Sequence, residues 1–157
     1  MPAPKNPDWL NSVHIEGISL ADLARTLPAM LGTANAERLN FIVRPFGADV
    51  TLMQLDDLDR EKLARVAPAM FLSIETSPEN FQAWLAMAGE EDKDFTRRVK
   101  RGTDADINAS GAPRIAGSLN LKPAYAPNHP RVAIRQIQLG RKTDARRARA
   151  AWRGRGA

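Results

Sequence analysis

The sequence contains no cysteine, only two histidines and no long apolar run. The absence of cysteine excludes disulfides, thiolate zinc sites and a cysteine nucleophile, and it suits a reducing compartment, so we expect a cytoplasmic protein. No stretch approaches the roughly 18 unbroken apolar residues that a membrane span needs, so we expect no membrane partner. With so few histidines, a bound metal has to rest on carboxylates, which favours Mg²⁺ or Mn²⁺.

What is present is typical of one globular domain: 157 residues, of which 43% are hydrophobic and 26% charged. The net charge of +5 makes an anionic partner plausible. Basic residues dominate from Arg114 onward, and residues 141–157 carry Asp144 as their single acid. Two interpretations of this end remain open, a solvated tail and an arm that touches phosphates without reading sequence.

Patterns along the chain predict alternating helices and hairpins. We expect a helix capped by Ser19 and ending near Gly32, strands at 39–45 and 50–55 forming a hairpin, and a helix capped by Asp59. Strands at 70–75 and 81–87 follow, joined by a turn that the Ser-Pro pair at 77–78 signals, then a helix at 90–101 with Phe95 and Val99 facing inward, and extended segments at 115–121 and 131–139. The order predicts an α+β fold, a mainly antiparallel sheet of hairpins with packed helices. No GxGxxG or P-loop motif is present. We divide the chain into a leader (1–15), a domain (16–140) and a basic tail (141–157).

Two adjacent carboxylates, Asp56 and Asp57, follow the apolar strand at 50–55. Adjacent negative charges repel, so something should compensate them. They could simply solvate and cap the next helix together with Asp59. Alternatively, they could hold divalent metal for phosphoryl transfer, which would need a third carboxylate from elsewhere in the chain.

The loop after the helix at 90–101 supplies two candidates for that third carboxylate, Asp104 and Asp106. The segment that follows has polar residues at even positions, which in a strand would share one face. These are Arg114, Ser118, Asn120 and Lys122. Such a row suits triphosphate oxygens, and the alternative is an edge strand with a solvated face.

The turn between the two central strands offers further polar groups. Ser77, Asn80 and Gln82 could donate hydrogen bonds beside the metal site, while Trp84 is expected in the core. The alternative is an ordinary hairpin.

Taken together, three blocks resemble the RepB-type plasmid and phage DNA primases, a branch of the archaeo-eukaryotic primase superfamily. The blocks are Leu55-Asp-Asp-Leu, Glu75-Thr-Ser-Pro-Glu-Asn-Phe-Gln-Ala-Trp84, and the segment from Ala105 through Lys122. The resemblance spans roughly residues 39 to 135. It implies a primase-polymerase-like catalytic core that binds nucleoside triphosphates and two divalent ions, Mg²⁺ or Mn²⁺. It further implies synthesis of short primers on a single-stranded DNA template, with a replication helicase or initiator proteins as partners.

The resemblance also implies residue roles. Asp56 and Asp57 match its first carboxylate motif, and Asp106 fits the third better than Asp104 does. Gln82 stands where many members have histidine, and Glu79 where glycine is frequent. A third set, Arg114, Asn120 and Lys122, is expected to face the triphosphate.

We therefore carry two hypotheses from the sequence. The first is a primase-like nucleotidyltransferase with Asp56, Asp57 and Asp106 as catalytic metal ligands, and with Ser77, Asn80, Gln82, Arg114, Asn120 and Lys122 binding nucleotide. The second is a replication module of the same fold that binds single-stranded DNA without turnover, with Trp152 among the tail arginines able to stack on a base. An unrelated α+β domain with solvated acids is a third, weaker possibility.

Overall fold

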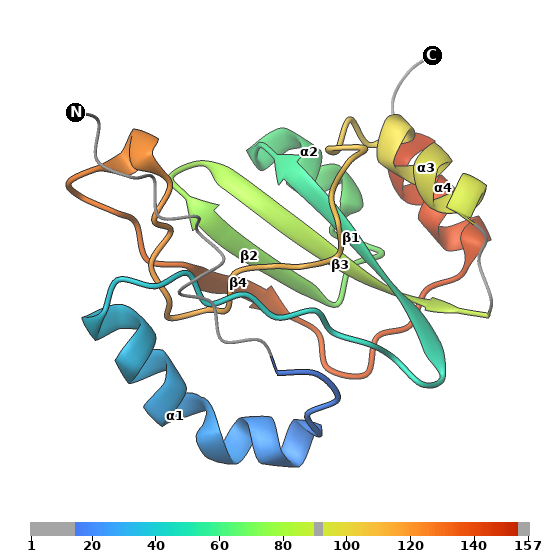
Figure 1. Cartoon of the computed structure of the whole chain (residues 1–157). Coiled ribbons are helices and arrows are strands. Elements are labelled where there is room, and N and C mark those ends of the chain that lie inside the picture. Colours follow the sequence, from blue (N-terminus) through green and yellow to red (C-terminus); the bar gives the residue numbers. More distant parts are fainter. Residues whose placement is uncertain (1–14, 90–92, 154–157) are drawn as a thin grey trace, which may run out of the picture.

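The computed structural model describes residues 15–89 and 93–153, with side chains as far as residue 150, and the leader expected at 1–15 falls almost wholly outside them. The chain forms α1 (Leu20–Ala36), β1 (Val50–Leu58), α2 (Arg60–Val66), β2 (Leu72–Ser77), β3 (Asn80–Ala88), α3 (Lys93–Gly102), the short 3₁₀ helix η2 (Pro123–Tyr125), β4 (Ala133–Ile137) and α4 (Ala145–Arg153). Figure 1 shows these elements as one sheet between helices and crossing loops.

The sheet has four strands in the order β1-β3-β2-β4, and every pairing is antiparallel. The α+β class with an antiparallel sheet is confirmed. So is the hairpin of β2 and β3, whose tight turn at Pro78 and Glu79 follows the polar Ser-Pro signal. Ser19 and Asp59 cap α1 and α2 as expected, since their side chains accept from Asp22 N and Lys62 N.

One face of the sheet, which we call the helical face, is apolar. Paired residues such as Leu55 with Ala83 and Met53 with Leu85 point to this face, where they form the main core with α2, α3 and α4. Phe95 and Val99 enter it from α3, as the sequence predicted. This core supplies most of the buried apolar surface, and hence the main driving force for folding.

The opposite face, which we call the loop face, is covered by irregular chain. It presents Gln54, Gln82, Trp84 and Ile74, and the segment 105–121 crosses it (Figure 1). Gly111 N donates to Gln54 Oε1 at 2.8 Å, which fixes this crossing against β1. Trp84 is 2% exposed, confirming its expected place in the core.

Two expected strands are wrong. Residues 39–45 do not pair with β1. Instead this segment pairs with residues 113–115 through an isolated bridge between Ile42 and Arg114. Val43 N donates to Pro113 O, and Ile115 N donates to Phe41 O. The segment 115–121 is likewise irregular: it crosses the loop face and does not join the sheet, and Gly117 takes a φ of 91°, which a regular strand does not have. The positive φ favours glycine at this position, and a Cβ here would lie 2.9 Å from Leu31 Cδ2 on α1, so that side chain would have to shift.

Both ends of the domain differ from expectation in helix content. The helix α1 runs past Pro28 and Gly32 to Ala36, where Glu37 N still bonds Thr33 O, because proline removes only one backbone bond. The segment treated as a basic tail forms α4 up to Arg153, and Ala148 is fully buried in the core. The side chain of Trp152 lies outside the described residues. No helix in the described ranges is long and apolar enough to cross a membrane.

Candidate metal and nucleotide site

A β-bulge places the two adjacent carboxylates near the end of β1. Pairing with β3 is regular as far as Leu55 and resumes at Leu58, so two residues of β1 stand opposite Gln82 alone. Asp57 takes a φ of 60°, and its N–H donates to Asp56 Oδ1 at 2.8 Å. Continuing the strand alternation puts Asp56 on the loop face beside Gln82, while Asp57 is exposed.

The carboxylate of Asp57 is held by the neighbouring hairpin. Asn80 Nδ2 donates to Asp57 Oδ1 at 2.8 Å, and Thr76 Oγ1 lies 3.3 Å from Asn80 Oδ1. Asn80 was expected to bind nucleotide. In the structure its amide group is engaged with Asp57 and Thr76, so it orients a carboxylate.

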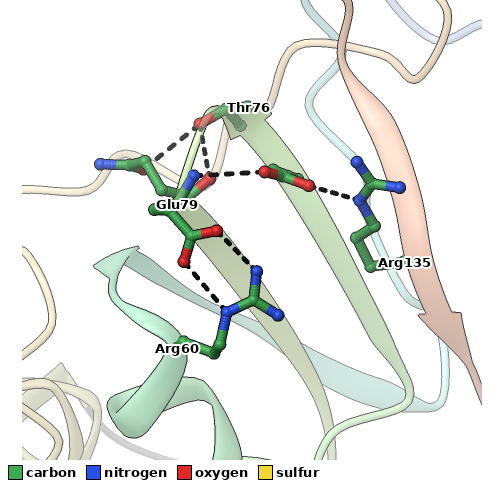
Figure 2. Close-up of polar contacts among 6 residues, drawn as sticks. Arg60, Thr76, Glu79 and Arg135 are labelled. Carbon is green, nitrogen blue, oxygen red and sulfur yellow. Dashed lines mark hydrogen bonds and ion pairs between the residues drawn. The ribbon is translucent and has the colours of Figure 1, made fainter.

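A second side-chain contact joins the start of α2 to the same hairpin. Figure 2 shows Arg60, the first residue of α2, donating to both carboxylate oxygens of Glu79, at 2.6 and 3.0 Å. This pairing holds the pKa of the Glu79 carboxyl below its usual value. Glu79 N in turn donates to Glu75 at 3.2 Å, and Glu75 pairs with Arg135 of β4. Side chains of β1 and of the start of α2 thus hold the hairpin where the bulge interrupts the backbone ladder.

The third carboxylate reaches the site through its backbone. Asp106 N donates to Asp56 O at 2.9 Å, which lays the loop after α3 along the end of β1. The Asp106 side chain is exposed and accepts from Asn108 N at 2.8 Å. Asp104, the competing candidate, lies 3.6 Å from Arg65 instead.

Gln82 and Ser77 are both buried, at 5% exposure each, but they differ in their partners. Gln82 Oε1 has no hydrogen-bond partner among the described residues. Ser77 Oγ accepts from the hydroxyl of Tyr125 at 2.9 Å. Because a buried carbonyl without a donor is costly, Gln82 is the group here that is best prepared to accept a bond from a ligand.

The row expected at 114–122 does not form, because that segment is no strand. Asn120 is 1% exposed and donates to Thr76 O at 2.8 Å, and Ser118 is fully buried with its hydroxyl on Ile115 O. Lys122 is exposed. Arg114 is partly buried: burial lowers the pKa of its guanidinium, and the nearby Asp56 carboxylate opposes that shift.

Sequence reasoning missed a cation beside the carboxylates. Lys100 of α3 is 7% exposed, and its ammonium donates to Ala109 O at 2.8 Å. Burial lowers the pKa of Lys100, while Asp106 and Asp56 act in the opposite direction. A signal was available: Lys100 directly follows the core residue Val99 and lies five residues after Phe95, on the inward side of a short helix.

The donor set suits a hard divalent cation, since carboxylate oxygens are the preferred ligands of Mg²⁺ and Mn²⁺. Asp56 and Asp106 meet through the loop, and Asp57 lies next to Asp56 in the chain. Within residues 15–89 and 93–153, however, no three acidic or histidine side chains are gathered closely enough to hold an ion together. The arrangement brings the three acids to one end of the sheet without closing them into a cluster.

No protein-family model matches the chain, and no curated protein does. Among solved structures it is similar to primase RepB′, with a TM-score of 0.65 and 23% identity, over 87% of this chain and 49% of that one. The catalytic domain of RepB′ in complex with initiator DNA gives 0.63 and 24%, over 87% and 74%. The AEP domain of the cyanophage S-2L primase-polymerase gives 0.53 and 14%, over 79% and 76%.

The chain thus spans about half the length of primase RepB′, and nearly three quarters of the RepB′ catalytic domain. The TM-scores show a shared architecture, and with identities below a quarter the likeness is one of fold alone. The three acids, the hairpin and the crossing loop therefore stand on a fold of the primase type, and the chain has the fold of the RepB′ catalytic domain.

Proposed function

We propose that the protein is a primase-like nucleotidyltransferase that makes short primers on single-stranded DNA for plasmid or phage replication. The observation that carries the proposal is the meeting of Asp56, Asp106 and Gln82 at one end of β1, on a fold shared with primase RepB′. Nucleoside triphosphates are the substrates, and a replication helicase or initiator protein would act with it. The absence of cysteine fits a cytoplasmic setting.

In this proposal Asp56, Asp57 and Asp106 hold Mg²⁺ or Mn²⁺, with Asn80 orienting Asp57. Two such ions supply charge stabilisation for the attacking and leaving oxygens of phosphoryl transfer. The carboxylates would carry the negative charge that binds the ions and would fix their place relative to the end of β1.

The remaining groups divide into those that contact nucleotide and those that shape its site. Arg114 and Lys122 would bind the triphosphate, and Gln82 would accept a hydrogen bond from the nucleotide or from water bound to it. Ser77 and Asn120 were expected to bind nucleotide directly. Because both are buried and engaged with Tyr125 and Thr76, we assign them to holding the loop against the hairpin.

The direct test is oligonucleotide synthesis on single-stranded DNA with Mg²⁺ or Mn²⁺ and either ribo- or deoxynucleotides. We expect products from the wild type and at least a hundredfold less from Asp56→Asn, because an amide cannot replace the charge that binds the ion. Glu61→Gln, an exposed acid on α2, is the matched control and should keep activity. Equal inactivity of the wild type and Asp56→Asn on every template would exclude the enzyme.

A binding module without turnover is the second candidate. It is favoured by the open arrangement of the acids, which the described residues do not gather into a cluster, and by Gln82 at the place of histidine. In that case DNA affinity would fall steeply with salt, and the aspartate variants would bind DNA as the wild type does while no primer is made.

A further inference from the structure

Two neighbouring helices on the helical side of the sheet carry a concentration of arginines. We call this surface the arginine face, and it consists of exposed residues of α3 and α4. They are Arg97, Arg98, Arg101, Arg146, Arg147 and Arg149. All six lie on the opposite side of the sheet from Gln82 and the crossing loop. The resemblance to primases assigns no role to any of them.

The two sets of arginines form one surface because the helices lie side by side (Figure 1). The ring of Phe95 contacts arginines of both helices. The guanidinium carbons of Arg98 from α3 and of Arg149 from α4 each lie 5.9 Å from its centroid. Ala148 and Val99 pack beneath them in the core. The guanidinium groups are therefore held by a packed interface and do not belong to a separate tail.

Within the described residues no ion pair joins an arginine of this surface to an acid, although Asp94 and Asp144 stand at the starts of α3 and α4. The ion pairs of the described residues involve Arg25, Arg60, Arg65 and Arg135. Gathering like charges without partners is unfavourable, and an anion bound across them would relieve the repulsion.

A concave site adjoins the arginine face. A cavity of about 450 Å³ lies between the end of α2 and the start of α4, and it is lined by Pro68, Arg141, Lys142, Thr143, Arg147 and Ala150. One guanidinium nitrogen of Arg141 donates hydrogen bonds to Ala67 O at 3.2 Å and to Pro68 O at 3.3 Å, which fixes this side chain in the wall of the cavity. Thr143 is 4% exposed, and its hydroxyl has no partner among the described residues. A phosphate group has the charge and the acceptor oxygens that this lining calls for.

The chemistry of the surface favours nucleic acid over membrane or protein. No large apolar side chain is exposed on the described parts of α3 and α4, whereas a membrane-surface helix needs an apolar face and a protein interface an apolar centre. The cations are almost all arginine, whose planar fork binds phosphate in a bidentate manner.

We propose that the arginine face, together with the cavity at Lys142 and Thr143, binds the sugar-phosphate backbone of single-stranded DNA, and that the cavity contacts the DNA strand beside the end of β3 that lies opposite the carboxylates. The inference rests on the proposed function in taking that strand to be the template. It places these phosphate contacts on the helical side of the sheet, so the strand would continue around the domain from the carboxylates to α3 and α4.

The test is a salt titration of binding to a fluorescent single-stranded oligonucleotide, followed by anisotropy. We expect Arg97→Gln with Arg146→Gln to make the slope of log affinity against log salt less steep by about 1.4, since each lost phosphate contact removes about 0.7. At low salt, affinity should fall about tenfold or more. Arg38→Gln with Arg44→Gln, two exposed arginines before β1, removes the same charge and should leave the slope within about 0.3 of wild type.

Equal slopes for the two double variants would overturn the proposal, because net charge alone would then explain binding. Preferential loss of binding to anionic vesicles, with the DNA slope unchanged, would overturn it in favour of a membrane surface. The result is independent of turnover: Asp56→Asn should bind DNA with the wild-type slope, so failure of primer synthesis and failure of the arginine face are distinguishable.

Discussion

The two faces of the sheet are built in opposite ways. On the helical face, strand residues such as Leu55 and Leu85 pack against three helices in a continuous apolar core. On the loop face, a smaller apolar cluster of Ile74, Trp84 and Val132 lies beside buried polar side chains such as Gln54 and Gln82, and irregular chain is fixed there by hydrogen bonds between backbone and side chain. The difference separates two tasks, because an apolar core gives stability while a partly unsatisfied polar surface can exchange its internal contacts for those of a ligand.

If the two faces differ in this way, the largest difference between variants is expected in the free energy of unfolding. Leu55→Ala should lower the free energy of unfolding by about 2–5 kcal/mol, since it opens a cavity in a fully buried core. Gln82→Leu, on the neighbouring strand but on the other face, should leave stability unchanged or raise it, because it removes a buried carbonyl oxygen that has no donor. Urea unfolding measures both. A loss of more than about 2 kcal/mol in Gln82→Leu would show that the loop face is an ordinary core.

Lys100 lies on α3, on the helical face, and its ammonium donates to Ala109 O of the loop that crosses the other face. The pH dependence of stability that it contributes tests whether this ammonium is buried. Burial lowers its pKa in the folded state below the ordinary value of 10.5, so just below pH 10.5 the unfolded chain binds more protons than the folded one. Stability attributable to Lys100 therefore rises with pH in that interval. Lys100→Met should remove this rise, measured as the difference between the two proteins in urea unfolding at pH 8 and pH 10. If the free energies of unfolding of wild type and Lys100→Met change with pH in parallel, the Lys100 ammonium is exposed to solvent.

Substitution of Asn80 tests whether this side chain orients the Asp57 carboxylate at the bulge of β1. Asn80→Ala should weaken Mn²⁺ binding about three- to tenfold, because the Asp57 carboxylate loses the donor at 2.8 Å. Thr51→Ala is the control, a strand hydroxyl at the far end of β1. Calorimetric titration with Mn²⁺ provides the comparison. An unchanged affinity would mean that Asp57 takes no part in holding the ion.

The smallest effect is expected at the hairpin tip, where Glu79 has a φ of 60° and an exposed pairing with Arg60. Glu79→Gly loses the ion pair but accepts the positive φ freely, so its melting temperature should stay within about 2 °C of wild type. Glu79→Ala loses the pair and keeps the strained φ, so it should melt below the glycine variant. The reverse order would show that the ion pair governs the tip.

The sequence was sufficient wherever local chemistry decides structure. Caps at Ser19 and Asp59, the hairpin at Pro78, and the inward side of α3 follow from residues close in the chain. Partner choice between strands was not local. An apolar segment at 39–45 beside 50–55 looks like a hairpin, but 41–43 bonds to the distant residues 113–115, and among the described strands β1 pairs only with β3.

At the site, residue types were predictable and their states were not. Asp56 and Asp57 were singled out from their place after an apolar strand, and Asp106 from the resemblance. Long-range folding decided the rest, since burial of Asn120 beneath Thr76 depends on how the crossing loop meets the hairpin. Lys100 was missed because a lysine in a charged helix is usually solvated.

The central claim is that the carboxylate end of β1 binds divalent metal together with a nucleoside triphosphate. The most direct measurement is electron paramagnetic resonance of free Mn²⁺ in titrations of the protein with a non-hydrolysable deoxynucleoside triphosphate. The account predicts that the nucleotide strengthens Mn²⁺ binding by the wild type, and that Asp56→Asn weakens it at least tenfold. Equal Mn²⁺ binding by both proteins, with and without nucleotide, would contradict it.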